Sequence, residues 1–285
     1  MDTHASARRC DDRTPSRPML STALFSGASW IALLALAAPA HAQKRELSTD
    51  RPDQTESPYS VDAGHVQVES ELVSHAVTHE AGVTVRETHL MNMNVRVGLT
   101  ERVDAQLVLL PFVMVRTEDS AGSSSSVEGF GDTAVRAKIN LIGNDSGDFA
   151  LGLLPFVTLP TASEEALRVP RVEYGLAVPM GFALPADFAL GVMEQVDLVA
   201  GERNDYVVEL TQTITIGRAL VGDLGAFTEL ASSLSFEGGT DASLELHGGL
   251  TYGATDDIQL DAGVFGTLLG QGEDVRGFLG LTVRV

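Results

Sequence analysis

The sequence predicts an all-β protein: a single transmembrane antiparallel up-and-down β-barrel of about 12 strands, after an N-terminal signal peptide. From Val66 to Val285, runs of roughly ten residues alternate between apolar and polar side chains, and a turn closes each run. Beyond residue 42 no apolar run reaches the ~18 residues of a membrane helix, which excludes an inner-membrane helical transporter. A closed barrel is the other structure that pairs every backbone polar group inside lipid.

Three segments divide the chain. Residues 1–42 fit a secretory signal peptide, because basic residues precede an apolar run that ends in the small-x-small triplet Ala40-His41-Ala42. Residues 43–64 form a polar periplasmic segment, and residues 65–285 form the barrel. The whole chain has a formal net charge of −20, which makes nucleic acid an unsuitable partner.

The twelve predicted strands span residues 66–77, 90–99, 103–115, 132–142, 149–159, 172–184, 188–198, 206–217, 224–236, 243–253, 258–268 and 275–285. Tight connections, as at residues 100–102 and 185–187, alternate with mostly longer ones, as at residues 117–131 and 160–171. Short periplasmic turns and longer outer loops are typical of bacterial outer-membrane barrels. This predicts the outer membrane of a Gram-negative bacterium, with surrounding lipid and the barrel-assembly machinery as partners.

Aromatic residues of lipid-facing parity fall at strand ends, where the interfacial girdles of a barrel belong. They are Phe149, Tyr174, Phe182, Phe188, Tyr206, Phe236 and Tyr252. A soluble β-sandwich also alternates, but it would place these rings in mid-strand. Glu194 has lipid-facing parity within its strand, so either a β-bulge at residues 193–195 turns it inward or it lies near a membrane interface, and we favour the bulge.

Apolar residues of the opposite parity lie well inside their strands. We expect them to form an aromatic and apolar constriction in the lumen that favours small apolar or aromatic solutes over ions. The residues are Leu110, Phe112, Met114, Leu154, Phe156, Phe265 and Phe278. The alternative is that these side chains only fill space, because a 12-stranded barrel lies between the packed 8-stranded barrels and the open 16-stranded porins.

Charged residues of inward parity have mixed sign: Arg96, Asp104, Arg136, Lys138, Glu229, Asp261 and Arg284. Buried charges persist mainly as partners, so ion pairs that neutralise one another are favoured over an ion filter. The turn at residues 100–102 places Arg96 diagonal to Asp104 on the neighbouring strand, close enough to interact.

Catalysis is a competing class of function, because some outer-membrane barrels are hydrolases. His75, His79 and His89 lie around the first outer hairpin, but a spacing of four on a strand means only that two side chains share a face. No Ser/His/Asp grouping or third metal ligand is apparent. The sequence therefore predicts no catalytic residues, no metal site and no cofactor.

Residues 49–58 (TDRPDQTESP), followed by residues 63–69 (AGHVQVE), resemble the opening of the outer-membrane family of phenol meta-pathway degradation transporters. The glycine-rich turn at residues 129–133 and the late turn at residues 252–257 resemble two further landmarks of that family. The resemblance implies an outer-membrane barrel that passes small, often aromatic, compounds. The final Val285 departs from the aromatic residue that usually ends a barrel-assembly signal.

The segment from Glu46 to Tyr59 contains Pro52 and Pro58, which argue against a central strand. Asp50, Arg51 and Asp53 are candidates for a plug that folds against the charges of the lumen; the alternative is an unattached leader. These observations predict an outer-membrane channel or facilitated-diffusion transporter for small, apolar or aromatic solutes. A closed structural barrel is the runner-up, and an outer-membrane hydrolase the third possibility.

Overall fold

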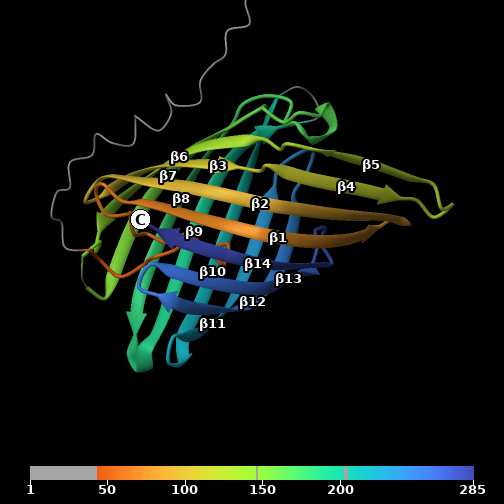
Figure 1. Ribbon diagram of the computed structural model, residues 1–285. Helices are drawn as coiled ribbons and strands as arrows, with labels where there is room; N and C mark the ends of the chain where they lie inside the picture. Colours follow the sequence, from red (N-terminus) through yellow and green to blue (C-terminus); the bar gives the residue numbers. More distant parts are fainter. Residues whose placement is uncertain (1–43, 146, 202–204) are drawn as a thin grey trace, which may run out of the picture. The chain divides into compact units, whose positions relative to one another are not determined.

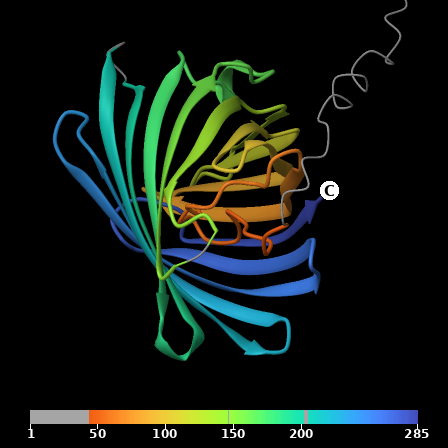
Figure 2. The same ribbon diagram turned by 90° about the vertical axis from the view of Figure 1, so that its left-hand side faces the viewer.

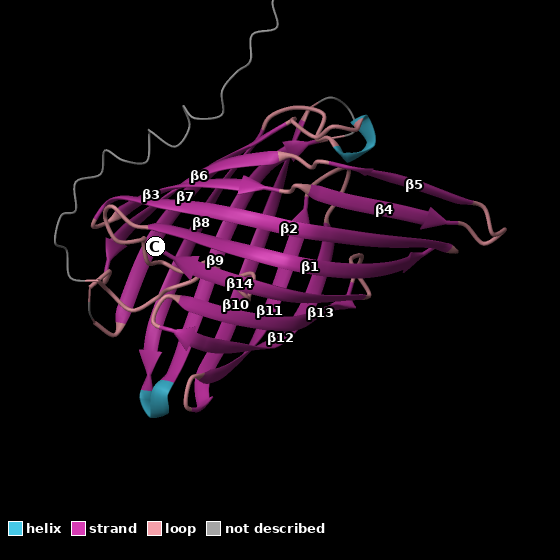
Figure 3. Ribbon diagram, viewed as in Figure 1, coloured by secondary structure: helices cyan, strands magenta, loops and turns pink. Residues whose placement is uncertain are grey.

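The computed structural model describes residues 44–145, 147–201 and 205–285, so the predicted signal peptide lies outside the described residues. These residues form one sheet whose strands are β1 (Val66–Glu80), β2 (Val83–Thr100), β3 (Val103–Leu109), β4 (Phe112–Glu118), β5 (Ser124–Gly129), β6 (Thr133–Ile142), β7 (Phe149–Leu159), β8 (Glu173–Leu184), β9 (Phe188–Ala200), β10 (Tyr206–Val221), β11 (Leu224–Ser235), β12 (Asp241–Thr255), β13 (Ile258–Leu269) and β14 (Val275–Arg284). Two single-turn helices, η2 (Glu165–Leu167) and η3 (Pro185–Asp187), lie in connections (Figure 3). No helix of the described residues is long and apolar enough to cross a membrane.

The sheet closes on itself, because β1 pairs with β14 on one side and with β2 on the other (Figure 1). β3 and β4 pair with successive halves of β2, so together they occupy one position around the barrel. β5 pairs with β4, and β6 pairs with β3, so these two strands also follow one path. The result is a closed antiparallel barrel of twelve positions, which confirms the predicted fold class.

The predicted strand 103–115 is interrupted at Leu110 and Pro111, between β3 and β4. Proline cannot donate to a ladder, and the break shifts the alternation by one residue. In β4, Val113 lies opposite His89 and is 4% exposed, whereas Phe112 lies opposite Leu90, which is 40% exposed on the outer face. Phe112, and with it Met114, therefore faces outward, so the expectation that they line the lumen is wrong.

Two long hairpins extend the barrel at the end opposite the C-terminus (Figure 1). β1 and β2 are joined at Ala81 and Gly82, both of which have positive φ. The predicted loop 117–131 is mostly strand, because β4 and β5 pair along a ladder in which Val113 lies opposite Gly129 at one end and Glu118 lies opposite Ser124 at the other. Serine-rich sequence suggested a loop there, but a hairpin ladder is built from backbone groups and tolerates serine side chains.

The bulge expected at Glu194 is absent. The pairing of β9 with β8 and with β10 runs through Glu194 without a register shift, opposite Val178 and Gln212 respectively. Glu194 therefore stays on the outer face, where Gln212 Nε2 donates a hydrogen bond to Glu194 Oε2 at 2.8 Å. This bond gives the carboxylate one partner without a change of register.

Candidate functional site in the barrel lumen

The N-terminal segment, residues 44–64, lies inside the ring of strands (Figure 2). Its own side chains close it into a loop: Ser48 Oγ and Ser57 Oγ are 2.7 Å apart, and Ser57 N donates to Asp50 Oδ1 at 3.2 Å. Glycine on the wall makes room for it, because a side chain at Gly98 would collide with the carbonyl of Asp62. Pairing of Val66 with Val285 fixes the segment's exit, with N···O distances of 2.9 and 2.8 Å.

Arg96 on β2 and Arg136 and Lys138 on β6 form the cationic wall of the lumen. Arg96 and Lys138 are 0% exposed. Arg96 Nη1 lies 3.0 Å from Asp50 Oδ2 of the N-terminal segment and 2.8 Å from Glu69 Oε1 of β1. Arg96 Nη2 lies 3.0 Å from Asp104 Oδ2, so the structure contains the diagonal pair expected from the sequence. One buried guanidinium thus joins two strands to the segment.

Two carboxylates of the segment meet this cationic wall. Lys138 Nζ pairs with Asp50, and it lies 3.5 Å from Glu56 Oε2. Glu56 also pairs with Arg136. Burial alone would raise the pKa of Asp50, but Arg96 and Lys138 hold that pKa well below its usual range. Burial raises the pKa of Glu56 despite the attraction of Arg136.

Glu229 on β11 and Asp261 on β13 form the anionic wall. Glu229 accepts hydrogen bonds from Gln54 N at 2.9 Å, and from Thr55 N and Thr55 Oγ1 at 2.8 and 2.5 Å. Asp261 Oδ1 lies 2.8 Å from Arg51 Nη2. The segment therefore presents the donors of Gln54 and Thr55 and the cation of Arg51 to the anionic wall, and the carboxylates of Asp50 and Glu56 to the cationic wall.

Aromatic rings line the lumen beside the anionic wall. His247 stacks on Phe265 with ring centroids 3.7 Å apart, and Phe278 meets Phe265 edge-on at 5.0 Å. The Arg51 guanidinium lies 5.2 Å from the centroid of Phe278. His247 Nδ1 is 2.6 Å from Glu229 Oε2, so the rings and the charges form one connected cluster.

The other predicted apolar residues do not join this cluster. Leu154 is fully buried with Ala177 and Met193, and Phe156 lies opposite Arg136 in the ladder of β6 and β7. Leu110 packs on Gly131 at the break between β3 and β4. The structure therefore assembles Phe265 and Phe278, sets Leu154 and Phe156 on another part of the wall, and places Phe112 and Met114 outside.

Asp53 and Arg284 complete the predicted set. Burial raises the pKa of Asp53 to about 7, and the nearby Glu229 carboxylate adds to this, whereas a hydrogen bond with Thr215 opposes it. Arg284 lies at the C-terminal end of the barrel, with its Nε 3.0 Å from Asp257 Oδ1 and its Nη1 3.6 Å from Asp62 Oδ2. Asp104 Oδ2 also accepts a hydrogen bond from Val61 N of the segment at 2.9 Å, so all seven predicted lumen charges contact the N-terminal segment.

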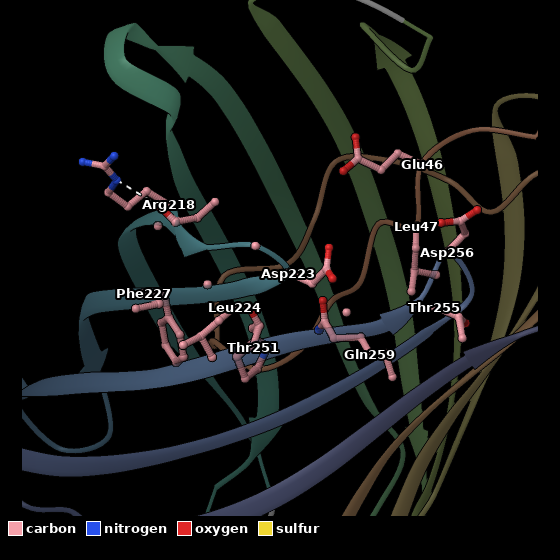
Figure 4. Close-up of a pocket in the computed structure, with 18 of the residues that line it drawn as sticks. Glu46, Leu47, Arg218, Asp223, Leu224, Phe227, Thr251, Thr255, Asp256 and Gln259 are labelled. Atoms are coloured by element: carbon pink, nitrogen blue, oxygen red, sulfur yellow. Dashed lines mark hydrogen bonds between the residues drawn. The ribbon is translucent and has the colours of Figure 1, made fainter.

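Two cavities flank the start of the segment at the end of the barrel that holds the C-terminus. One, of about 760 Å³, extends from the turns after β10 and β12 inward to Pro52, Asp53, Thr251 and Gln259 (Figure 4). The other, of about 1030 Å³, is lined by Tyr59, Gln67 and the turns after β2 and β6. Small-molecule sites have volumes of about 300–1,000 Å³, so the first cavity falls within this range and the second is at its upper limit.

The histidines considered for catalysis are dispersed. His75 Nδ1 is 2.9 Å from Thr88 Oγ1, His79 Nδ1 is 2.5 Å from Asp274 Oδ2, and His89 Nδ1 is 3.8 Å from Glu71 Oε1. Among the described residues no group of three or more His, Cys, Asp or Glu side chains is arranged to hold a metal ion.

Sequence reasoning missed four members of the luminal network: Glu69, Glu71, Glu245 and the role of His247. Glu71 Oε2 lies 3.7 Å from Arg51 Nη1, and Glu71 Oε1 lies 3.1 Å from Arg276 Nη2. Glu245 Oε2 lies 2.9 Å from His247 Nε2. Glu69 and Glu71 share inward parity with Gln67 on β1, and this parity was the available signal. Their partners come from distant strands, which periodicity does not identify.

Three solved structures have a similar fold. An outer-membrane channel from Pseudomonas putida F1 aligns with a TM-score of 0.60 and 15% identity, over 84% of this chain and 100% of that one. The β domain of the Bordetella autotransporter BrkA aligns with a TM-score of 0.53 and 14% identity, over 79% of this chain and 100% of that domain. The NanC porin aligns with a TM-score of 0.50 and 10% identity, over 77% of this chain and 100% of the porin.

At these identities the likeness concerns the fold, which is that of outer-membrane barrels. A closed barrel with an apolar outer wall belongs in the outer membrane of a Gram-negative bacterium. No curated protein sequence matches the chain. The profile of the family described as "Putative MetA-pathway of phenol degradation" matches residues 49–285, and the chain belongs to that family, as the motif at residues 49–58 predicted.

Proposed function

We propose that the protein is an outer-membrane channel for facilitated diffusion of small, apolar or aromatic solutes, and that the N-terminal segment is its plug. The observation that carries this proposal is the arrangement of the lumen. A polar segment is bound between two walls of opposite charge, and cavities of about 760 and 1030 Å³ remain on either side of its start. A lumen filled only for stability has no need of such space.

Several features support the choice of solute. His247 and Phe278 are buried, and Arg51 of the segment lies over the Phe278 ring. Displacement of the segment would offer the ring faces and edges of the stacked His247–Phe265 pair and of the edge-on Phe278 to a planar aromatic molecule. The charges near these rings are already paired, which leaves little attraction for free ions. The family description names phenol degradation, and the fold neighbours include an outer-membrane channel and a porin.

A closed structural barrel is the second candidate, and the luminal network is the observation that favours it. Arg96 and Lys138 are fully buried in ion pairs with the N-terminal segment, and a network satisfied on all sides resists opening. An outer-membrane hydrolase has no such support, because the candidate histidines are dispersed. We therefore propose a non-enzymatic role.

Conductance of the refolded protein in a planar bilayer tests the proposal, recorded with and without a small phenolic compound on one side. We expect openings that the phenolic compound interrupts. In the Phe265→Ala/Phe278→Ala variant the interruptions should become shorter and rarer. Phe112→Ala is the matched control, because Phe112 faces outward and its loss should change nothing. A folded protein that never conducts would favour the structural barrel.

A further inference from the structure

We propose that the outer face of β8–β11 is the interface of a two-fold symmetric homodimer, centred on the hydrogen-bonded pair of Glu194 and Gln212. Both side chains are exposed on the outer wall of the barrel, and they lie directly opposite each other on β9 and β10. Gln212 Nε2 donates to Glu194 Oε2 at 2.8 Å. Within the described part of the chain, this is the one hydrogen bond that either side chain makes.

Aromatic residues on the same strands mark the two membrane boundaries. At one boundary the ring centroids of Tyr206 and Tyr174 are 6.1 Å apart, and the Tyr206 hydroxyl donates a hydrogen bond to Val172 O at 2.8 Å. At the other, the Arg218 guanidinium lies 4.7 Å from the ring centroid of Phe188. Rings with a polar neighbour are typical of the membrane–water interface.

The Glu194–Gln212 pair is midway between these boundaries. Tyr206 lies opposite Ala200 at one boundary, and Arg218 lies opposite Phe188 at the other. Glu194 and Gln212 are each six residues from both boundaries along their own strands. At about 3.3 Å per residue and a tilt near 40°, that separation is roughly 15 Å along the membrane normal. The pair is therefore at the depth of the bilayer centre.

A carboxylate facing hydrocarbon at this depth is unfavourable, and polar side chains inside membranes are normally turned toward protein or water. The other outward positions of β8–β11 between the boundaries are apolar or carry hydroxyl groups. Val196, Ile214 and Leu230, which surround the pair, are all exposed. The face therefore has a polar centre and an apolar surround, and apolar side chains can pack there once the centre finds a partner.

A second copy of the chain supplies that partner by symmetry. Two barrels inserted in the same direction are related by a two-fold axis along the membrane normal, which keeps every residue at its own depth. An axis passing between β9 and β10 brings Glu194 of one protomer opposite Gln212 of the other, and the reverse. Each amide has a second N–H to donate and each carboxylate a second oxygen to accept it. Hydrogen bonds across the axis are thus reciprocal.

Thiol cross-linking in lipid vesicles tests this interface. The variant Ile214→Cys in a Cys10→Ser background carries one cysteine beside the pair, and Leu279→Cys on the outer face of β14 is the matched control. We expect a short bifunctional thiol reagent to link Ile214→Cys into dimers and to leave Leu279→Cys monomeric. Equal cross-linking at both positions, or linkage of Ile214→Cys only to a different protein, would overturn the proposal.

A second measurement uses the protein without added cysteines. The monomer–dimer equilibrium is followed in lipid nanodiscs or vesicles at several protein-to-lipid ratios. In Glu194→Leu/Gln212→Leu the apparent dissociation constant should rise about tenfold or more, because the reciprocal hydrogen bonds are lost. Glu194→Gln keeps donors and acceptors and should remain dimeric. Unchanged far-UV circular dichroism establishes that each barrel is folded. A monomeric wild type at every ratio, or a dimer that the double substitution leaves unchanged, contradicts the interface.

Discussion

The two walls of the lumen bind the same short segment by different means. The cationic wall uses Arg96, Arg136 and Lys138 to hold the carboxylates of Asp50 and Glu56. On the anionic wall, Glu229 accepts hydrogen bonds from Thr55, and Asp261 pairs with Arg51. The first wall depends on ion pairs in which Arg96 and Lys138 are fully buried, and the second mostly on hydrogen bonds to one carboxylate. The segment is therefore oriented by charge, and we expect its attachment to the cationic wall to be the stronger of the two.

Removal of the segment should have the largest effect, because it takes away the partners of both walls together. Deletion of residues 49–58 is expected to raise single-channel conductance well above that of the full-length protein. Planar-bilayer recording provides the measurement, and far-UV circular dichroism checks that the barrel is intact. Conductance equal to that of the full-length protein would mean that the segment does not obstruct the pore.

Arg96→Met tests the cationic wall. It leaves the Asp50, Glu69 and Asp104 carboxylates near one another without their shared counter-ion. Breaking a buried ion pair from one side costs about 3–5 kcal/mol, which should appear as a lower urea midpoint by circular dichroism and as more frequent channel openings. A variant as stable as wild type would show that the wall does not anchor the segment.

Glu229→Gln tests the anionic wall and should have a smaller effect. Gln54 N and Thr55 N donate to different oxygens of Glu229, and the amide keeps only one acceptor oxygen, so one of these two hydrogen bonds is lost. No charge is left unpaired, because His247 keeps Glu245 as a partner. We expect a loss of about 1–2 kcal/mol in the free energy of unfolding. If this loss equals that of Arg96→Met, the two walls contribute alike and the contrast between them is wrong.

Opening should depend on pH through Asp53, which lies on the segment near the anionic wall. Its pKa is raised to about 7, so the bound segment favours the protonated carboxyl. The contribution of Asp53 to closure is complete below the usual pKa near 4 and is lost as the pH rises through about 7. Conductance should therefore increase between about pH 4 and pH 7 and level off above that. The same titration of Asp53→Asn should be flatter, and an unchanged profile would exclude Asp53 as its source.

Lys44→Ala should have the smallest effect. Lys44 pairs with Asp257 at the rim, where both side chains are partly exposed, and the hydrogen bond from Lys44 lowers the pKa of Asp257. Exposed ion pairs contribute little to stability. Neither the urea midpoint nor the conductance should change measurably, and a marked loss of closure would show that the anchoring extends beyond the two walls.

Much of the barrel could be predicted because each strand by itself shows the alternation of apolar and polar residues. Alternation along each strand assigned an inward direction to the charges from Arg96 to Arg284, and all of them lie in the lumen. The pairing of Arg96 with Asp104 followed from the length of one turn. These features depend on residues close in sequence, where strand geometry leaves few choices.

The errors arose where alternation is locally broken or where partners are distant. The break at Leu110 and Pro111 turned Phe112 outward, and a single shifted residue reverses every position after it. Glu194 was expected to force a bulge, but it stays on the outer face, where Gln212 on the next strand donates a hydrogen bond to it. The stacking of His247 on Phe265 joins two strands through a register that the sequence does not specify.

Reversible tethering of the N-terminal segment tests whether displacement of this segment opens the pore. Thr55 Oγ1 and Thr213 Oγ1 are 2.6 Å apart, so the pair Thr55→Cys and Thr213→Cys, in a Cys10→Ser background, places two thiols in contact. Single-channel conductance is then recorded before and after addition of a reductant. We predict a silent channel while the disulfide holds and openings like those of wild type after reduction. Equal conductance in the oxidised and reduced protein would contradict the account.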